Sequence, residues 1–213
     1  MPKTWVSHPI FARVYASVSP GMDQGGVAEH RRRLLAGLTG RVIEVGAGNG
    51  LNFAHYPPEV TGVLAVEPEL HLRTLAQRNA ARAPVPVEVV DGVAEQLPAG
   101  EATFDAAVAT LMLCSVADQQ TALREMYRVL RPGGQLRFFE HVRADRPALA
   151  HVQSVLDATV WPTLCGGCHV SRDTAAAIRN AGFTIERLDR FRFPDTRRPL
   201  PSSPHILGVA SRP

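Results

Sequence analysis

A glycine-rich segment in the first quarter of the chain reads Glu44-Val45-Gly46-Ala47-Gly48-Asn49-Gly50. It ends a β-branched run that begins at Arg41, and a short helical pattern follows it. Glycine at positions 46 and 48 permits a tight turn and a close approach of the backbone to a ligand. The next β-like run ends in Glu67, about 20 residues further on, where a carboxylate can accept both hydrogen bonds from a ribose diol. The pattern therefore predicts a nucleoside site at the end of the first strand of a parallel sheet.

Two alternatives compete with this interpretation of the glycine loop. A nicotinamide dinucleotide site would need glycine at position 51 to complete G-x-G-x-x-G, and Leu51 stands there. The glycines instead alternate at 46, 48 and 50, behind the acid at 44. A purely structural turn in another kind of α/β protein stays open at this point.

Strand-like and helix-like segments alternate through the chain. The predicted strands are Arg41–Val45, Val63–Glu67, Val85–Val90, Phe104–Thr110, Gln135–Val142, Phe183–Arg190 and His205–Ala210. The predicted helices are Glu69–Arg82, Asp118–Leu130, Asp145–Val160 and a last one that is capped by Ser171 and ends near Gly182. Because parallel strands need crossover helices, this order predicts an α/β fold with a single doubly wound, mostly parallel, seven-stranded sheet.

An N-terminal helical arm, residues 1–38, is expected to precede the main domain, residues 39–213. Its first helix should end at Ser19-Pro20-Gly21, and a second should run from Val27 to Leu38. The apolar positions at helical spacing in the first helix are Phe11, Val14, Tyr15 and Val18.

Composition narrows the class of protein. The chain has 213 residues, 45% of them hydrophobic and 20% charged, which is typical of one globular domain. It has no apolar run of the roughly 20 residues that a membrane-spanning helix needs, and no secretory signal, so a cytoplasmic location is expected. The net charge of +3 comes from scattered arginines, so no nucleic-acid partner is expected; the oligomeric state stays open.

Further segments extend the pattern of a nucleoside site. They are Gly92-Val93-Ala94-Glu95-Gln96-Leu97-Pro98 after the third strand, Phe104-Asp105-Ala106-Ala107-Val108, and Leu130-Arg131-Pro132-Gly133-Gly134 before the fifth strand. With the glycine loop, these segments resemble the class I S-adenosylmethionine-dependent methyltransferases, whose domain is Rossmann-like. The resemblance implies S-adenosylmethionine as methyl donor, with Glu67 on the ribose, the backbone N–H of Ala94 on the adenine, and Glu95 or a backbone carbonyl on the adenine amino group. The residues that it places at the cofactor are Glu44, Gly46, Ala47, Gly48, Gly50, Asn52, Glu67, Ala94, Glu95 and Thr110.

The second half of the chain is similar to a narrower group. Four segments resemble parts of the thiol S-methyltransferases of animal membranes. They are Thr110-Leu111-Met112-Leu113-Cys114-Ser115-Val116, Phe139-Glu140-His141-Val142, Tyr56-Pro57-Pro58 and Gly167-Cys168. Those proteins carry an N-terminal membrane anchor, which is not expected here. The resemblance implies methyl transfer to a small hydrophobic acceptor, first a thiol and otherwise a quinone, phospholipid or other lipid-like molecule. Tyr15, Leu111 and Cys114 are the candidate substrate-pocket residues.

His141 is the candidate catalytic residue. It ends the fifth predicted strand, at the edge of the sheet that faces the ligand, and imidazole titrates near neutrality, as a general base requires. The alternative is a structural histidine that positions a loop. Glu140 should point to the opposite face of the sheet from His141.

The run Cys165-Gly166-Gly167-Cys168-His169 has the spacing of haem and metal motifs. No export signal accompanies it, and no second cysteine pair at matching spacing completes a zinc site. We therefore expect no metal, and interpret the segment as a Gly-Gly loop at the substrate entrance. With three cysteines and no signal sequence, no disulfide framework is expected either.

Two other functions are alternatives to a small-molecule methyltransferase. Adenine N6-methyltransferases carry an Asn/Asp-Pro-Pro-aromatic motif after the fourth strand, and Thr110-Leu111-Met112-Leu113 does not match it. A non-catalytic regulatory protein that binds the cofactor is the alternative outside enzymology, and only turnover separates it from an enzyme.

Overall fold

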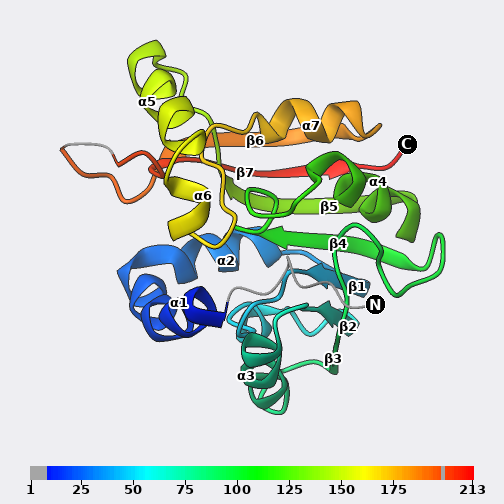
Figure 1. Ribbon diagram of the computed structural model, residues 1–213. Helices are drawn as coiled ribbons and strands as arrows, with labels where there is room; N and C mark the ends of the chain where they lie inside the picture. Colours follow the sequence, from blue (N-terminus) through cyan, green and yellow to red (C-terminus); the bar gives the residue numbers. More distant parts are fainter. Residues whose placement is uncertain (1–8, 198–199) are drawn as a thin grey trace.

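A seven-stranded sheet in the order β3-β2-β1-β4-β5-β7-β6 runs through the protein (Figure 1). The computed structural model describes residues 9–197 and 200–213, so residues 1–8 of the expected arm lie outside the described part. The strands are β1 (Gly40–Val45), β2 (Val60–Val66), β3 (Val87–Val90), β4 (Phe104–Thr110), β5 (Leu130–His141), β6 (Thr184–Arg192) and β7 (Pro204–Ser211).

The pairing of the strands confirms the predicted fold class. β1 pairs in parallel with β2 and β4, β2 with β3, and β4 with β5. Only β7 runs antiparallel to both of its neighbours, β5 and β6. The strand order reverses at the β1–β4 pair, since β2 lies on one side of β1 and β4 on the other. In doubly wound sheets a ligand crevice opens at that point, outside the carboxyl ends of the strands.

Helices cover both faces of the sheet. They are α1 (Pro9–Met22), α2 (Ala28–Leu35), α3 (Leu70–Ala80), α4 (Gln119–Val129), α5 (Pro147–Asp157), α6 (Trp161–Leu164) and α7 (Thr174–Asn180), with a π-helix at Asp23–Val27 and a 3₁₀ turn at Phe53–His55. Because side chains alternate across a strand, Ile43 of β1 packs in one core with Leu123 of α4, while Val42 packs in a second core with Leu34 and Ala76. Among the described residues, no helix has both the length and the apolar character needed to cross a membrane.

The N-terminal arm differs from its prediction. α1 does not stop at Ser19-Pro20-Gly21 but continues to Met22 with Pro20 inside it. Ser19 is buried, and its hydroxyl accepts a hydrogen bond of 3.0 Å from the Asn49 side chain, which ties this turn to the glycine loop. Tertiary contact thus outweighs the turn signal, and the chain changes direction later, at Gly26 with φ 118°.

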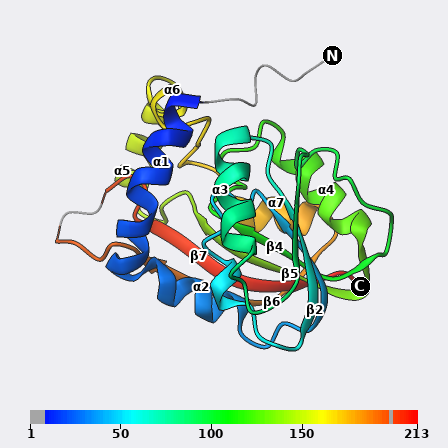
Figure 2. The ribbon, with the colours of Figure 1, turned by 90° about the horizontal axis from the view of Figure 1, so that it is seen from below.

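The packing face of α1 also differs from the predicted one. Val14 and Val18 are 54% and 49% exposed, whereas Ala12 and Ser19 are buried. The N-terminal end of α1 lies next to α6 (Figure 2), where the ring of Phe11 fills the space beside Gly166. The helix therefore buries its small residues, with Ser19 against the glycine loop, and leaves exposed the valines that the helical spacing marked as apolar positions.

The residue predicted to cap the N-terminus of α7 is wrong. Ser171 does not cap this helix; its hydroxyl and backbone N–H both donate to the Asp157 carboxylate. Asp173 is the N-cap, and its side chain accepts from the backbone N–H of Ala176 at 3.0 Å. Both residue types favour N-caps, so local sequence alone did not separate them.

Asp173→Ala should lower the free energy of unfolding by about 1 kcal/mol, because it leaves an N–H of the first turn of α7 without its acceptor. Asp173→Ser is the matched control, since serine retains a capping oxygen and should keep most of the stability. Urea unfolding followed by circular dichroism gives both values. Equal stability of the alanine variant and the wild type would show that Asp173 does not cap α7.

Candidate active site

A cavity of about 340 Å³ opens at the carboxyl ends of β1, β2 and β4. The glycine loop follows β1, Glu67 follows β2, and Thr110 ends β4, so the reversal of strand order brings these three segments together. Eight of the residues expected at the cofactor or the substrate line it: Tyr15, Gly46, Gly48, Glu67, Ala94, Glu95, Thr110 and Leu111. Six do not: Glu44, Ala47, Gly50, Asn52, Cys114 and His141.

The glycine loop has the backbone that the sequence led us to expect. Gly46 and Gly48 have φ of 68° and 58°, a left-handed conformation that strains most other residues. A Cβ at Gly46 would lie 2.8 Å from the Cβ of Met112, so the close approach of these two loops requires glycine.

Glu67 presents its carboxylate to the cavity with spare hydrogen-bonding capacity. One oxygen accepts from the backbone N–H of Gly48 at 2.7 Å, and the other accepts from the N–H of Glu69 at 3.0 Å. Each oxygen keeps a second lone pair, the arrangement that a vicinal diol needs. Burial raises the pKa of Glu67 to about 6, although the two backbone N–H groups oppose that shift. The residue is an acceptor in its ionised form and becomes partly protonated below neutral pH.

Glu44 and Asn52 lie beneath the glycine loop rather than in the cavity wall. The Asn52 amide donates to one oxygen of Glu44 at 2.9 Å, and the Tyr56 hydroxyl donates to the other at 2.7 Å. The same amide lies 3.0 Å from the Thr110 hydroxyl, and Arg31 donates to the Asn52 carbonyl. Burial raises the pKa of Glu44 to about 7. This buried network joins β1, β4 and α2, so its role in the structure is to hold the loop.

Glu140 supports the wall of the site from within the protein, a role that was not predicted from the sequence. Its buried carboxylate accepts from the backbone N–H groups of Met112 and Leu113 at 3.0 Å and of Cys114 at 3.4 Å. It thereby fixes the turn after β4, in which Leu111 has φ 54°, a strained value for a residue with a side chain. Only the unusual acid inside the apolar run of β5 could have signalled this role.

Aromatic residues of α1 close one side of the cavity. Phe11 and Tyr15 both line it, with their ring centroids 5.9 Å apart. Gly166 and Gly167, which follow α6, line it beside them, so the Gly-Gly loop forms part of the cavity wall. The cavity is also lined by four residues that were not predicted from the sequence to lie there: Leu72, Met112, Val116 and His169.

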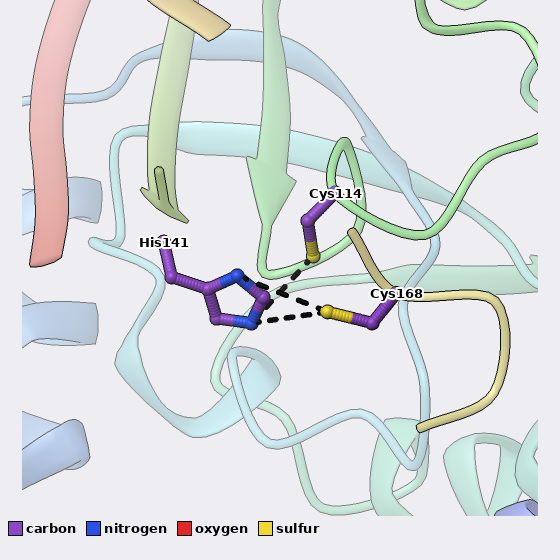
Figure 3. A group of neighbouring side chains, drawn as sticks. All are labelled: Cys114, His141 and Cys168. Carbon is purple, nitrogen blue, oxygen red and sulfur yellow. Dashed lines mark hydrogen bonds between the residues drawn. The ribbon is translucent and has the colours of Figure 1, made fainter. Parts of the chain in front are cut away.

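Cys114, His141 and Cys168 meet just behind this wall (Figure 3). The sulfurs of Cys114 and Cys168 lie 3.7 and 3.6 Å from Nε2 of His141. The proximity of Cys114 and then burial raise the pKa of Cys168 well above its ordinary value, so in the absence of a cation its sulfur is a neutral thiol. Cys165, the other half of the C-x-x-C pair, does not join this group.

These features fit an adenosine ligand that continues into a methionine chain. A carboxylate with two free lone pairs suits a ribose, Val93 and Leu72 offer apolar surface to an adenine, and the glycine loop leaves room beside β1 for a flexible chain. S-adenosylmethionine has these three parts, with the ribose between the adenine and the methionine chain.

Comparison with known proteins agrees with this fit. Residues 43–138 match the model of a methyltransferase domain. The human thiol S-methyltransferases TMT1B and TMT1A are 34% and 35% identical to the chain over 181 residues each, with 83% and 82% of this chain and 73% and 72% of those proteins covered. Demethylmenaquinone methyltransferase of Mycobacterium tuberculosis is 34% identical over 119 residues, which cover 56% of this chain and 48% of that protein.

The same fold occurs in solved structures. A methyltransferase structure from Bacillus halodurans superposes with a TM-score of 0.70 at 19% identity, covering 89% of this chain and 99% of that one. The protein is a methyltransferase with S-adenosylmethionine as its methyl donor. The chain belongs to the family of S-adenosylmethionine-dependent methyltransferases that includes the thiol S-methyltransferases.

Proposed function

We propose that the protein methylates a small hydrophobic thiol. The observation that carries the proposal is the similarity to TMT1B and TMT1A, which extends over 181 residues and thus well beyond the methyltransferase domain at 43–138. Phe11, Tyr15, Gly166 and Gly167, which lie outside that domain, complete the cavity wall. We assign the acceptor to this part of the cavity because the cofactor features all lie within residues 43–138.

In this proposal the loop residues hold the cofactor and the apolar residues hold the acceptor. Glu67 accepts from the ribose hydroxyls, Ala94 and Glu95 flank the adenine, and Gly46, Gly48 and Thr110 flank the methionine part. S-adenosylmethionine supplies an electrophilic methyl group on a sulfonium sulfur. The protein's main contribution is alignment, because a nucleophile held about 3 to 3.5 Å from the methyl carbon needs little further help.

The chemistry of the lining favours an apolar acceptor. Phe11, Leu111, Met112 and Val116 contribute apolar surface to the cavity wall. A thiol with a pKa of about 8.5 is more readily ionised than an alcohol, so it asks less of a general base. A quinol acceptor is the second candidate, favoured by the similarity to demethylmenaquinone methyltransferase.

The cytoplasmic location stays a prediction.

Glu67→Gln should weaken S-adenosylmethionine binding by about 1.5 to 3 kcal/mol, since it removes charge-assisted hydrogen bonds to the ribose. In the wild type the affinity should also rise from pH 5 to pH 7, because the pKa of Glu67 is about 6 and only its ionised form accepts both hydrogen bonds. Titration calorimetry at several pH values measures both effects. Glu88→Gln, on the exposed part of β3, is the control. The ribose assignment fails if the Glu67→Gln variant binds as tightly, or with the same pH dependence, as the wild type.

Phe11→Ala should raise the KM for the acceptor about tenfold, which corresponds to about 1.4 kcal/mol of lost apolar contact. Cofactor affinity should change much less. Val14→Ala on the exposed side of the same helix is the matched control and should leave both constants near wild type. Steady-state kinetics with one acceptor decides; an equal loss of cofactor and acceptor binding would contradict the assignment of this wall.

The acceptor class is tested by product formation. We would incubate the purified protein and S-adenosylmethionine with each member of a panel of acceptors. The panel contains alkyl and aromatic thiols, their matched alcohols and a naphthoquinol. Mass spectrometry then quantifies S-adenosylhomocysteine and the methylated product. We expect methyl thioethers, with rates that increase with the apolar size of the thiol. Turnover of the quinol alone would refute the thiol acceptor and support the quinol. Cofactor binding without any product would support a regulatory protein.

A further inference from the structure

Three ligand-type side chains converge at one point from separate segments of the chain. Cys114 lies in the turn after β4, His141 ends β5, and Cys168 follows α6 (Figure 3). Their ligand atoms all lie within 4.8 Å of one another. Both cysteines are buried and neither forms a disulfide.

The distances agree with those between ligands of one zinc ion. Tetrahedral Zn²⁺ binds thiolate sulfur at about 2.3 Å and imidazole nitrogen at about 2.0 to 2.1 Å, so a sulfur and a nitrogen on the same ion are separated by about 3.6 Å. Nε2 of His141 lies 3.7 Å from the sulfur of Cys114 and 3.6 Å from that of Cys168. The Cys168 sulfur also lies 3.9 Å from Nδ1, so the imidazole ring turns its Nε2 toward the two sulfurs when the three side chains share a metal ion.

The backbone around the group is fixed in advance. The Glu140 carboxylate holds the turn that carries Cys114, and the N–H of His169 donates to the carbonyl of Cys114 at 2.8 Å. The carboxylate of Asp157 accepts from the N–H groups of Val170 and Ser171, which anchors the segment after Cys168. Such supporting hydrogen bonds are what orient the ligands of a metal site.

The ligand set indicates which metal and which kind of site. Two thiolates and one imidazole suit zinc, whereas carboxylate and water ligands suit magnesium or manganese. Within residues 9–197 and 200–213, no fourth cysteine, histidine or acid joins the group. A structural zinc site has four protein ligands, while three protein ligands with an open position are typical of catalytic zinc.

The three ligands are next in sequence or space to residues that line the cavity. Ser115 follows Cys114 in the chain, Gly167 and His169 flank Cys168, and all three line the cavity. The three ligands therefore lie in the second layer of the wall where we place the acceptor.

We propose that Cys114, His141 and Cys168 bind a Zn²⁺ ion whose fourth position takes the acceptor thiol as a thiolate. This inference rests on the proposed thiol acceptor. On binding zinc, Cys114, Cys168 and the acceptor each give their S–H proton to the solvent, because a thiol that coordinates zinc is deprotonated. The acceptor sulfur then forms a bond to the methyl carbon as the bond from that carbon to the sulfonium sulfur breaks. The products are a methyl thioether and S-adenosylhomocysteine, and no oxidant or reductant is needed.

The first test is metal content. Protein produced with zinc in the medium and then dialysed should contain about one zinc per chain by mass spectrometry of the elements. Cys114→Ser, His141→Asn and Cys168→Ser should each lose most of it. Cys165→Ser is the matched control, because it lies three residues from Cys168 but outside the group, and it should retain the metal. Calorimetry with S-adenosylmethionine verifies that each variant is folded.

The second test uses cobalt as a spectroscopic probe of the open position. Co²⁺ in the site should show sulfur-to-cobalt charge-transfer absorption, and addition of an alkyl thiol should shift its visible bands. Removal of zinc by a chelator should slow turnover of an alkyl thiol by roughly 30-fold at pH 7, the factor by which a thiol of pKa about 8.5 is protonated there. An aromatic thiol of lower pKa should lose less.

Three results would overturn the proposal. In the first, the wild-type protein takes up neither zinc nor cobalt. In the second, Cys165→Ser loses the metal and Cys168→Ser retains it. In the third, the visible bands of the cobalt protein do not shift when the thiol is added. Thiol turnover at an equal rate in zinc-free protein would refute the zinc step while leaving the proposed thiol function intact. Stoichiometric zinc with turnover of the quinol alone would instead refute the proposed acceptor, and with it the thiolate step.

Discussion

The pairing of β1 with β4 is the constraint on which the rest of the site depends. At this pair the strand order reverses, so the segments that follow β1 and β4 diverge to opposite faces of the sheet. The crevice between them receives the glycine loop from one side and the Leu111 turn from the other. Every other element at this edge, including α1 and the Gly166-Gly167 loop, packs around an opening that the topology has already made.

Three buried carboxylates hold that opening in shape. Glu44 in β1, Glu67 after β2 and Glu140 near the end of β5 each accept hydrogen bonds from a neighbouring loop or side chain. Burial raises the pKa of all three. Because a buried carboxyl is costly unless its acceptors are satisfied, each one enforces the position of the donors around it. Of the three, only Glu67 lines the cavity, and thus only it has lone pairs to offer to a ligand there.

Much of the fold was predictable from the sequence because local patterns and topology agree. The strand at Phe104–Thr110 has the predicted bounds, and Leu111 and Thr110 lie where the alternation of strands and helices places them. β5 begins earlier than predicted, since Leu130 pairs with Phe104 and the N–H of Gly133 donates to Arg212. That pairing is made by residues distant in sequence, so the Pro-Gly-Gly signal alone suggested a turn.

The site was less predictable wherever its parts come from distant segments. The spacing of Cys165 and Cys168 drew attention to a local pair, yet Cys168 meets Cys114 and His141, which lie 54 and 27 residues away in the chain. Similarly, Glu44 and Asn52 carry the expected polar groups but turn them toward each other and Tyr56 rather than into the cavity. Local spacing identifies chemically capable residues; which of them meet is decided by the packing of loops.

The most direct test of this account is the position of the acceptor sulfur in a crystal structure with S-adenosylhomocysteine and a hydrophobic thiol. We expect the ribose on Glu67 and the acceptor's apolar part against Phe11 and Leu111. Its sulfur should lie between the Leu111–Cys114 turn and the Gly166-Gly167 loop, directed toward the sulfur of the cofactor. An acceptor bound elsewhere on the protein, or a ribose that does not contact Glu67, would contradict it.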